Sequence, residues 1–371
     1  MKLHSLSALG IVLLAATDCC TAQPALKDTF KDKFLIGTAL NPRQFTGQDQ
    51  RGVELIKTHF NSVTPENVLK WALVHPRPGT NGYDFDAADR FVEFGERNGM
   101  TIIGHTLVWH SQTPRWVFEG NNGQPATRDQ LLERMRDHIH TVVGRYKGRI
   151  KGWDVVNEAL NEDGTLRQSP WLRIIGEDYL VKAFEYTREA DPQAELYYND
   201  YSLENEPKRN GTVALVKKIQ SHGVKVDGIG TQQHVKMDWP TISQVDDTIA
   251  AFAALGVKVM ITELDVDVLP AATRDAGADV ATRLQMRAGL NPYSNGLPAT
   301  VQQELADRYA DLFRAYLRHS DKITRVTLWG VTDGDSWLNN WPIRGRTSYP
   351  LLFDRQGKPK PAFDAVINTA R

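Results

Sequence analysis

The stretch Trp153-Asp154-Val155-Val156-Asn157-Glu158 has the composition of a short buried strand. Its centre is apolar and β-branched, and it ends in an amide followed by a carboxylate. The pattern returns further along the chain in residues 257–265, VKVMITELD, which places Glu263 at the end of a second strand. In parallel α/β barrels, catalytic side chains occupy this position. Taken alone, either glutamate could equally be a solvated strand end or a partner in a salt bridge.

Composition indicates a large folded domain with no strong charge imbalance. The 371-residue chain is 41% hydrophobic and carries a formal net charge of −1. Nucleic-acid binding normally requires a basic excess, and a membrane surface attracts one, so neither partner is expected. Length alone does not count domains, because barrels often exceed the usual length of one domain.

Residues 1–22 have the features of a secretory signal peptide and not of a folded element. Lys2 precedes an apolar run, 6–16, that is too short for a stable membrane anchor, and Thr21-Ala22 offer a cleavage site. We therefore expect a secreted or periplasmic protein that begins near Gln23. A lipoprotein signal would need a small residue before the acylated cysteine, and Asp18 fits that poorly. Both cysteines lie at 19–20, so the mature chain has none for a disulfide.

From residue 23 onward, short apolar runs alternate with segments of helical periodicity, and no composition break divides them. The predicted strands are 34–40, 61–66, 101–109, 152–158, 195–201, 227–234, 258–266 and 322–330. The predicted helices are 50–59, 85–98, 127–146, 171–189, 212–221, 242–255, 300–318 and 362–367. Eight strand–helix units predict that residues 23–371 form a single (β/α)₈, or TIM, barrel. In the helix 127–146 we expect His138 and His140 on or beside the solvated face.

The ends of the predicted strands carry polar and aromatic side chains. They are Glu66, Asn67, Lys70, His105, Trp109, Gln112, Asn157, Glu158, Asn199, Tyr201, Gln232, His234, Glu263, Asp265, Trp329 and Trp337. Aromatic faces and hydrogen-bonding groups together suit a sugar. The tryptophans near Gly330 and Gly334 argue against a phosphate site, which would want glycine-rich turns. The irregular stretch 267–297 follows strand seven, so we expect it to lie over the site.

No catalytic metal is expected. His105 and His110 are five residues apart, so on a regular strand they would face opposite sides. No other group of histidines, cysteines and acids has the spacing of metal ligands. No other cofactor is indicated.

Seven motifs, in order, resemble the family-10 glycoside hydrolases, which are mainly endo-β-1,4-xylanases. They are TPEN-x-LKW (64–71), GHTLVWHSQTP (104–114), WDVVNE (153–158), YYNDY (197–201), GIGTQQH (228–234), ITELD (261–265) and LWGVTDGDSW (328–337). The resemblance spans residues 30–367. It implies a barrel that hydrolyses internal bonds of xylan with retention, through a covalent glycosyl-enzyme intermediate.

The resemblance implies that Glu158 is the acid/base and Glu263 the nucleophile. In retaining enzymes the two carboxyl groups lie about 5–5.5 Å apart. Glu263 must be ionised and Glu158 protonated, and the charge on Glu263 raises the pKa of Glu158. After glycosylation that charge is gone, so Glu158 can act as a base on water.

The remaining roles are also implied by the resemblance. His234 and Asp265 support the nucleophile, and Asn157 binds the sugar 2-hydroxyl. Because consecutive strand residues face opposite sides, Asn157 and Glu158 reach one site only if the strand breaks or bulges there. The other substrate-binding residues are Glu66, Asn67, Lys70, Gln112, Trp329 and Trp337 on the glycone side, His105 beside the scissile bond, and Tyr201 and Asn199 on the leaving-group side. Shaping the loop is the alternative role of Asn199. Trp109 belongs to the wall or the core, and Gln232 binds substrate without an assigned side.

Two other functions remain open at this stage. A related retaining glycosidase would act on β-glucan or mannan, although Lys70 and Trp337 would crowd the hydroxymethyl group that xylose lacks. A secreted carbohydrate-binding protein would have a degenerate catalytic pair, whereas both carboxylates are present here. We expect xylan and xylo-oligosaccharides as the partners and a monomeric protein.

Overall fold

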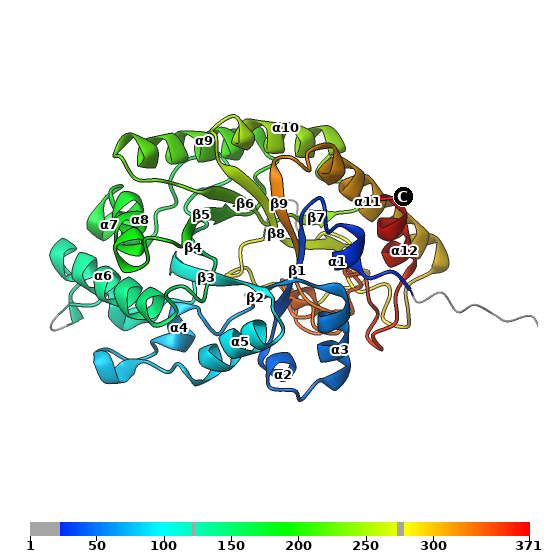
Figure 1. Ribbon diagram of the computed structural model, residues 1–371, viewed down its shortest axis with the longest axis horizontal. Coiled ribbons are helices and arrows are strands. Elements are labelled where there is room, and N and C mark those ends of the chain that lie inside the picture. Colours follow the sequence, from blue (N-terminus) through cyan, green and yellow to red (C-terminus); the bar gives the residue numbers. More distant parts are fainter. Residues whose placement is uncertain (1–22, 121–122, 273–277) are drawn as a thin grey trace, which may run out of the picture.

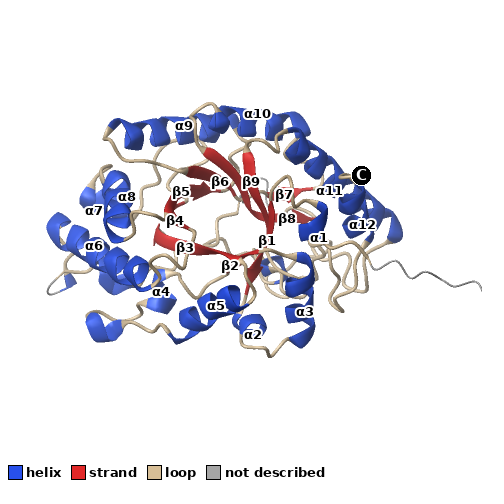
Figure 2. Cartoon of the chain, viewed as in Figure 1, coloured by secondary structure: helices blue, strands red, loops and turns tan. Residues whose placement is uncertain are grey.

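The computed structural model describes residues 23–371, apart from 121–122 and 273–277. The predicted signal peptide, 1–22, lies outside the described residues. Strands gather at the centre, and helices surround them (Figures 1 and 2). This arrangement is the predicted single barrel.

The central sheet is parallel and closed. Its order is β6-β5-β4-β3-β2-β1-β9-β8, and the pairing of β6 with β8 joins the two edges. Closure leaves no sheet edge unpaired within the barrel and brings the carboxyl ends of all its strands to one face. The strands are β1 (Leu35–Leu40), β2 (Ser62–Pro65), β3 (Thr101–Trp109), β4 (Gly152–Asn157), β5 (Glu195–Asp200), β6 (Gly228–Thr231), β7 (His234–Lys236), β8 (Lys258–Asp267) and β9 (Ile323–Leu328).

The sixth predicted strand was wrong in one respect, because 227–234 is not continuous. The chain leaves β6 at Gln232 and Gln233, and Gln233 has φ of 58°. It resumes as β7, which pairs with β8 so that His234 lies opposite Asp265. This break places a histidine beside the end of β8.

The helices pack outside the strands, and two of the longer ones begin at a capping box. Thr127 and Thr241 each accept from the backbone three residues on, while Gln130 and Gln244 return the bond. The helices are α1 (Leu26–Thr29), α2 (Pro42–Phe45), α3 (Gln50–His59), α4 (Trp71–Val74), α5 (Asp86–Arg97), α6 (Arg128–Arg145), α7 (Pro170–Ile175), α8 (Tyr179–Ala190), α9 (Glu206–Ser221), α10 (Ile242–Ala253), α11 (Ala299–Arg318) and α12 (Pro361–Asn368), with 3₁₀ turns η1 (Thr80–Gly82), η2 (Arg115–Phe118) and η4 (Trp337–Asn339). Within the described ranges no helix is long and apolar enough to cross a membrane.

Two helix predictions were wrong. The predicted helix 171–189 is two helices, because Gly176 adopts φ of 92° after α7 and the chain restarts at α8. His138 is fully buried and does not lie on the solvated face. Its ring stacks on Trp71 at 3.6 Å between centroids, and its Nδ1 lies 3.4 Å from Nδ1 of His75. An aromatic partner and a second imidazole make this interior position possible.

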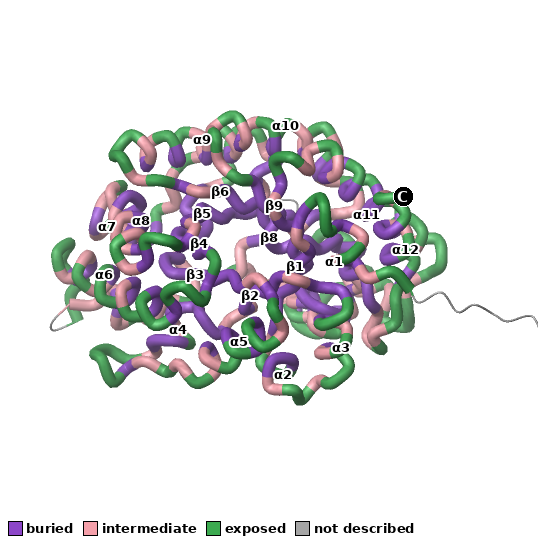
Figure 3. Tube along the Cα trace, in the orientation of Figure 1, coloured by how far each residue is buried: buried purple, intermediate pink, exposed green. Residues whose placement is uncertain are grey.

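Burial follows the layers of the barrel: buried residues gather along the central strands, and exposed residues lie mainly on the outer helices and loops (Figure 3). Inside, large and small residues alternate between neighbouring strands. Gly104 lies opposite Trp153, and a Cβ at Gly104 would stand 2.1 Å from the indole. The glycine in GHTLVW is therefore required for close packing, and the interior is filled with side chains.

Candidate active site

One pocket at the carboxyl ends of the strands contains most of the predicted residues. It is lined by Lys70, His105, Trp109, Asn157, Glu158, Gln232, His234, Glu263, Ala278, Val280, Trp329 and Trp337. The two glutamates, which are far apart in sequence, thus face one cavity. Each is almost fully buried, at 4% exposure for Glu158 and 5% for Glu263.

The predicted irregularity of the fourth strand is confirmed. Relative to β5, the register of β4 shifts between Asp154 and Val156, so that Val155 is an extra residue. At the end of the strand Glu158 adopts φ of 57°, which is uncommon for a residue with a Cβ. The bulge and the left-handed residue allow Asn157 and Glu158 to face the same pocket.

The surroundings of Glu158 favour its protonated form, so that the carboxyl group loses its proton near neutral pH and not in the usual acidic range. Burial is the largest cause, and with the negative charges of Asp200 and Glu263 it raises the pKa of Glu158 to about 7. Two donors oppose the shift: Gln232 Nε2 donates to Oε1 over 3.0 Å, and Trp109 Nε1 donates to Oε2 over 2.8 Å. These bonds also hold the carboxyl group in one orientation.

The surroundings of Glu263 favour its ionised form. Burial alone would raise its pKa, but the hydrogen bond with His234 and the nearby imidazoles outweigh that effect, so the pKa of Glu263 lies below its usual value. His234 Nε2 is 3.2 Å from Oε2 of Glu263, and Nδ1 is 3.0 Å from Oδ1 of Asp265. Burial opposes the charge on His234, yet the two carboxylates raise its pKa to about 10. Trp337 Nε1 donates to Asp265 over 2.8 Å.

Asn199 does not lie on the leaving-group side of the pocket, where it was predicted. It is fully buried beneath the pocket, and its amide is already used by protein groups. Nδ2 donates to Oε1 of Glu263 over 2.8 Å and to Oδ1 of Asn157 over 2.9 Å, and Oδ1 accepts from Thr262 over 2.6 Å. Both N–H groups of the amide are used by the protein and the side chain is fully buried, so Asn199 positions the nucleophile and does not face a sugar.

The predicted glycone-side residues form a connected polar rim. Lys70 Nζ donates to Asn67 Oδ1 and to Gln112 Oε1, each over 3.1 Å, and Gln112 Nε2 donates to Asn67 over 3.2 Å. Glu66 is half-buried beside them, and the charge of Lys70 opposes the rise that burial causes in the pKa of Glu66. Lys70 also lies 4.9 Å from the centroid of the Trp109 ring. The rim therefore offers fixed donors and acceptors next to aromatic surface.

His105 lies in the pocket wall, between Trp329 and a buried carboxylate. Its Nδ1 is 2.9 Å from Oδ2 of Asp154, and its ring meets Trp329 at 5.4 Å between centroids. The aspartate orients the imidazole, so that Nε2 is the nitrogen free to meet a substrate.

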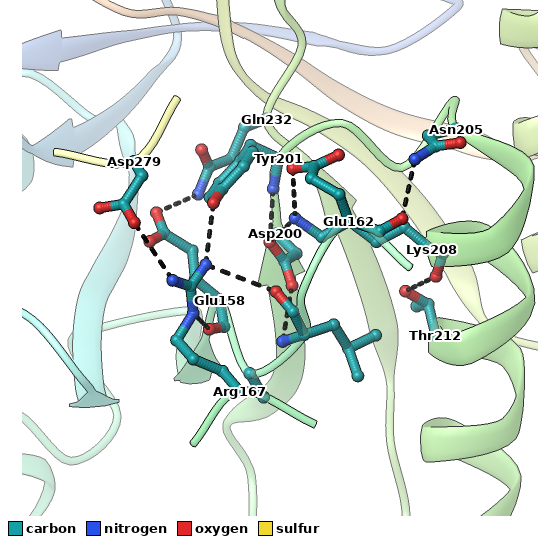
Figure 4. A network of polar contacts seen from close by, with 12 residues as sticks. Glu158, Glu162, Arg167, Asp200, Tyr201, Asn205, Lys208, Thr212, Gln232 and Asp279 are labelled. Carbon is teal, nitrogen blue, oxygen red and sulfur yellow. Dashed lines mark hydrogen bonds and ion pairs between the residues drawn. The ribbon is translucent and has the colours of Figure 1, made fainter. Parts of the chain in front are cut away.

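On the opposite side, Tyr201 lies in a network around Arg167 (Figure 4). Arg167 donates to the Tyr201 hydroxyl over 2.8 Å and to the carbonyl oxygen of Glu158 over 3.2 Å. It also pairs with Asp279 at 3.2 Å, and Asp279 accepts through its backbone oxygen from Trp341 Nε1 over 3.0 Å. The described part of the 267–297 stretch thus reaches the site, as expected, and Ala278 and Val280 form part of the pocket wall.

His105 and His110 line different pockets. Across residues 23–120, 123–272 and 278–371, no three histidine, cysteine or acidic side chains are grouped as metal ligands would be.

Several residues at the site were missed from the sequence. Asp154 interrupts an apolar strand, and a carboxylate in that position is a signal that could have been used. Gly230 is required because a Cβ there would stand 2.4 Å from Oδ1 of Asn199. Arg167 and Lys208 carry no such signal, since charged residues are common in the loop and the helix that contain them. Asp200 ends strand β5 within the YYNDY motif, where it could have been singled out.

A closed parallel barrel whose strand ends hold two buried glutamates, one with a raised pKa and one with a lowered pKa, beside aromatic rings and polar donors, has the chemistry of a glycoside hydrolase. A family model described as Glycosyl hydrolase family 10 matches residues 25–369. The chain belongs to this family, as its motifs indicated.

Characterised relatives cover almost the full length of the chain. Endo-1,4-beta-xylanase A of Xylanibacter ruminicola is 45% identical over 359 residues, 97% of this chain and 97% of that protein. Beta-1,4-xylanase of Dictyoglomus thermophilum is 42% identical over 346 residues, 93% of this chain and 90% of that protein. Among solved structures, a GH10 endoxylanase retrieved from a sugarcane soil metagenome superposes with a TM-score of 0.90 at 47% identity, covering 93% of this chain and 99% of that one.

Proposed function

We propose that this protein is a secreted endo-1,4-β-xylanase that cleaves internal bonds of xylan by double displacement. The observation that carries the proposal is the opposite electrostatic environment of Glu158 and Glu263 in one pocket. The full-length similarity to characterised xylanases supports xylan as the substrate class. Export rests on the signal-peptide pattern of residues 1–22 alone.

In the first step, the ionised Glu263 attacks the anomeric carbon while Glu158 protonates the leaving oxygen. The Glu263–carbon bond forms as the glycosidic bond breaks, and the proton of Glu158 leaves with the departing alcohol. Glu263 then carries no charge, so the pKa of Glu158 falls and its carboxylate can deprotonate a water molecule. The water attacks the same carbon, releases Glu263 and restores the proton to Glu158, with net retention.

The stereochemistry and the intermediate can be tested directly. Proton NMR of the first product should show the β-anomer before mutarotation. An activated 2-fluoro xyloside should add one glycosyl unit to the intact mass, and proteolysis should locate it on Glu263. An initial α-anomer, or no adduct with rapid turnover, would contradict double displacement.

Glu158→Ala tests the acid/base assignment. The variant should retain most of its kcat/KM on an aryl xyloside with a good leaving group and lose it on a poor one. Its kcat on the good substrate should fall, because hydrolysis of the intermediate lacks a base, and azide should restore that rate. Equal loss on both substrates, with no azide rescue, contradicts the role of Glu158. Initial rates on xylan and carboxymethylcellulose separate xylanase from glucanase activity, and a preference for cellulose would overturn the substrate class.

A further inference from the structure

Two charged residues that the proposed chemistry does not use lie behind the acid/base. Asp200 and Lys208 are both fully buried. Lys208 Nζ is 3.0 Å from Oδ1 of Asp200 and 3.5 Å from the centroid of the Tyr201 ring. Neither residue lines the pocket that holds Glu158 and Glu263. Burying an ion pair costs free energy of desolvation, so the pair calls for an explanation beyond stability.

Asp200 holds the turn that follows Glu158. Its Oδ2 accepts from the Tyr198 hydroxyl over 2.5 Å and from the backbone N–H of Leu160 over 3.4 Å. The same hydroxyl accepts from the N–H of Ala159 over 3.2 Å. The two residues after the acid/base are therefore both tied, directly or through one hydroxyl, to a single carboxylate.

This turn needs support because Glu158 is in the left-handed region, at φ of 57°. Such a conformation is unfavourable for a residue with a Cβ, because the Cβ approaches the following carbonyl oxygen. The N–H of Glu158 donates to the carbonyl of Asn199 over 2.9 Å, and its own carbonyl accepts from Arg167. Together with the ties to Asp200, these bonds fix the backbone on both sides of the carboxyl group.

The same pair fixes Tyr201, the predicted leaving-group residue. Its N–H donates to Oδ1 of Asp200 over 2.9 Å, and its ring lies against the Lys208 ammonium. Its hydroxyl accepts from Arg167 over 2.8 Å. Backbone, ring and hydroxyl are thus each held by a charged group (Figure 4).

We propose that Asp200 and Lys208 form a positioning pair, in which the carboxylate fixes the 158–160 turn and Tyr201 while the ammonium compensates the charge buried behind the acid/base. The inference rests on the proposed roles of Glu158 and Tyr201. In this role the pair aligns the proton of Glu158 with the leaving oxygen. Its loss should therefore slow departure of the leaving group and leave binding on the glycone side unchanged.

The pair also acts on the charge balance around Glu158. The charged and titratable groups that face Glu158 are Asp200, Glu263, Arg167, Lys70, Tyr201 and His110. Those that face Asp200 are Lys208, Tyr198, Tyr179, Tyr201 and Arg167. After burial, the charge of Asp200 is the largest contribution that raises the pKa of Glu158. Removing Asp200 and Lys208 together should therefore lower that pKa.

The double variant Asp200→Asn/Lys208→Met removes both charges without leaving either one unpaired. We expect the basic limb of the kcat/KM profile to move to lower pH, because Asp200 is the member of the pair whose charge raises the pKa of Glu158. The move should be smaller than the roughly one pH unit that a single uncompensated charge produces, since the Lys208 charge, which acts in the opposite sense, is removed as well. The acidic limb should not move. The loss of kcat should be several-fold larger on a poor leaving group than on an activated aryl xyloside. A folded double variant with an unmoved basic limb and equal losses on both substrates overturns the proposal.

Tyr198→Phe separates geometry from charge, because it breaks the link to Ala159 and keeps Asp200 and Lys208. It should reproduce the leaving-group dependence without moving the basic limb. If the double variant does not fold, an unchanged ratio of rates in Tyr198→Phe overturns the proposal. Glu162→Gln is the matched control, because Glu162 also pairs with Lys208, at 3.4 Å, but is 46% exposed; it should keep the wild-type profile. Failure of azide rescue in Glu158→Ala would instead contradict the proposed function itself.

Discussion

The side-chain amide of Asn199 donates to Oε1 of Glu263 over 2.8 Å, from a position that is fully buried beneath the pocket. Thr262 Oγ1 donates to the other end of the same amide over 2.6 Å, which fixes its orientation. The nucleophile therefore receives one hydrogen bond from a neutral donor on β5 and another from His234 beside β8. Both favour the carboxylate over the acid.

Asn199→Ala should slow glycosylation and move the acidic limb of the pH profile upward. A hydrogen bond to a charged acceptor contributes about 1.5–3 kcal/mol to the stability of the charged form. Losing the bond from Asn199 should therefore lower kcat/KM roughly ten- to hundredfold. Its loss raises the pKa of Glu263, so the ionised nucleophile disappears at a higher pH. Steady-state kinetics across pH measure both effects.

Gly230→Ala provides an independent check on the same contact. Its Cβ would stand 2.4 Å from Oδ1 of Asn199 and 2.7 Å from Cγ2 of Thr262, so the amide must shift. We expect a loss in the same direction as Asn199→Ala. An unchanged acidic limb in both variants would show that Asn199 does not tune the nucleophile.

The wild-type profile of kcat/KM should be bell-shaped, with its basic limb near pH 7. Glu158 must be protonated to donate, so activity falls as pH rises through its raised pKa of about 7. Glu263 must be ionised to attack, so activity falls as pH drops through its lowered pKa. The two values belong to the coupled pair. A basic limb in the ordinary range of glutamate would contradict this electrostatic account.

Asp265→Asn should change the protonation of His234 more than any other single substitution. Asp265 faces His234 Nδ1 at 3.0 Å and is the largest contribution that raises the pKa of His234 to about 10. The wild-type ring should remain protonated through neutral pH in NMR titrations, and the variant ring should titrate at a lower pH. With less positive charge beside it, Glu263 should have a higher pKa. The amide oxygen of the variant side chain can still accept from Trp337, so the tryptophan should keep its place.

Asp279→Ala should weaken the wall that the 267–297 stretch adds to the pocket. Asp279 is held by Arg167 through its side chain and by Trp341 through its backbone. Arg167 keeps its bonds to Glu158 and Tyr201, so kcat and both pH limbs should be unchanged. We expect a several-fold rise in KM for short xylo-oligosaccharides. Asp311→Ala removes an exposed pair with Arg314 and should have no effect; a fall in kcat for Asp279→Ala would mean that the wall acts on catalysis.

The His75–His138 pair should make stability fall in acid. Burial lowers the pKa of both rings, and the charge of His75 lowers the pKa of His138 further. The unfolded chain binds these protons first, so the stabilisation is complete above the ordinary histidine value of about 6.5 and is lost as pH falls below it. For one proton the slope is about 1.4 kcal/mol per pH unit.

Chemical denaturation at several pH values, comparing wild type with His138→Phe, isolates this effect. Phenylalanine keeps a ring against Trp71 but cannot take up a proton, so the stability of the variant should depend less on pH. Buried histidines that do not touch His138, such as His59, contribute equally to both proteins and cancel, whereas His75 loses its partner, so the difference reports the His75–His138 pair. Identical pH slopes in the two proteins would contradict the assignment.

The order of the elements was largely predictable because each strand and helix carries its own pattern. Strand ends could be located from WDVVNE and ITELD, and one closed barrel brings such ends to one face. Glu158, Glu263, His234 and Lys70 were found in this way, and the structure places them in one pocket. The break of 171–189 at Gly176 was missed, because a glycine within a helical pattern does not by itself decide whether the helix stops.

Local pattern therefore determined the strand order, the two carboxylates and the residues around them. Only the tertiary structure decided that Asn199 lies beneath the nucleophile, that His138 is buried against Trp71, and that Asp200 and Lys208 support the turn at Glu158. Each of these depends on contacts between segments that are distant in sequence. The charge of a buried group is set by desolvation and by hydrogen bonds from such distant segments. The pattern of residues within one segment carries no information about these contacts.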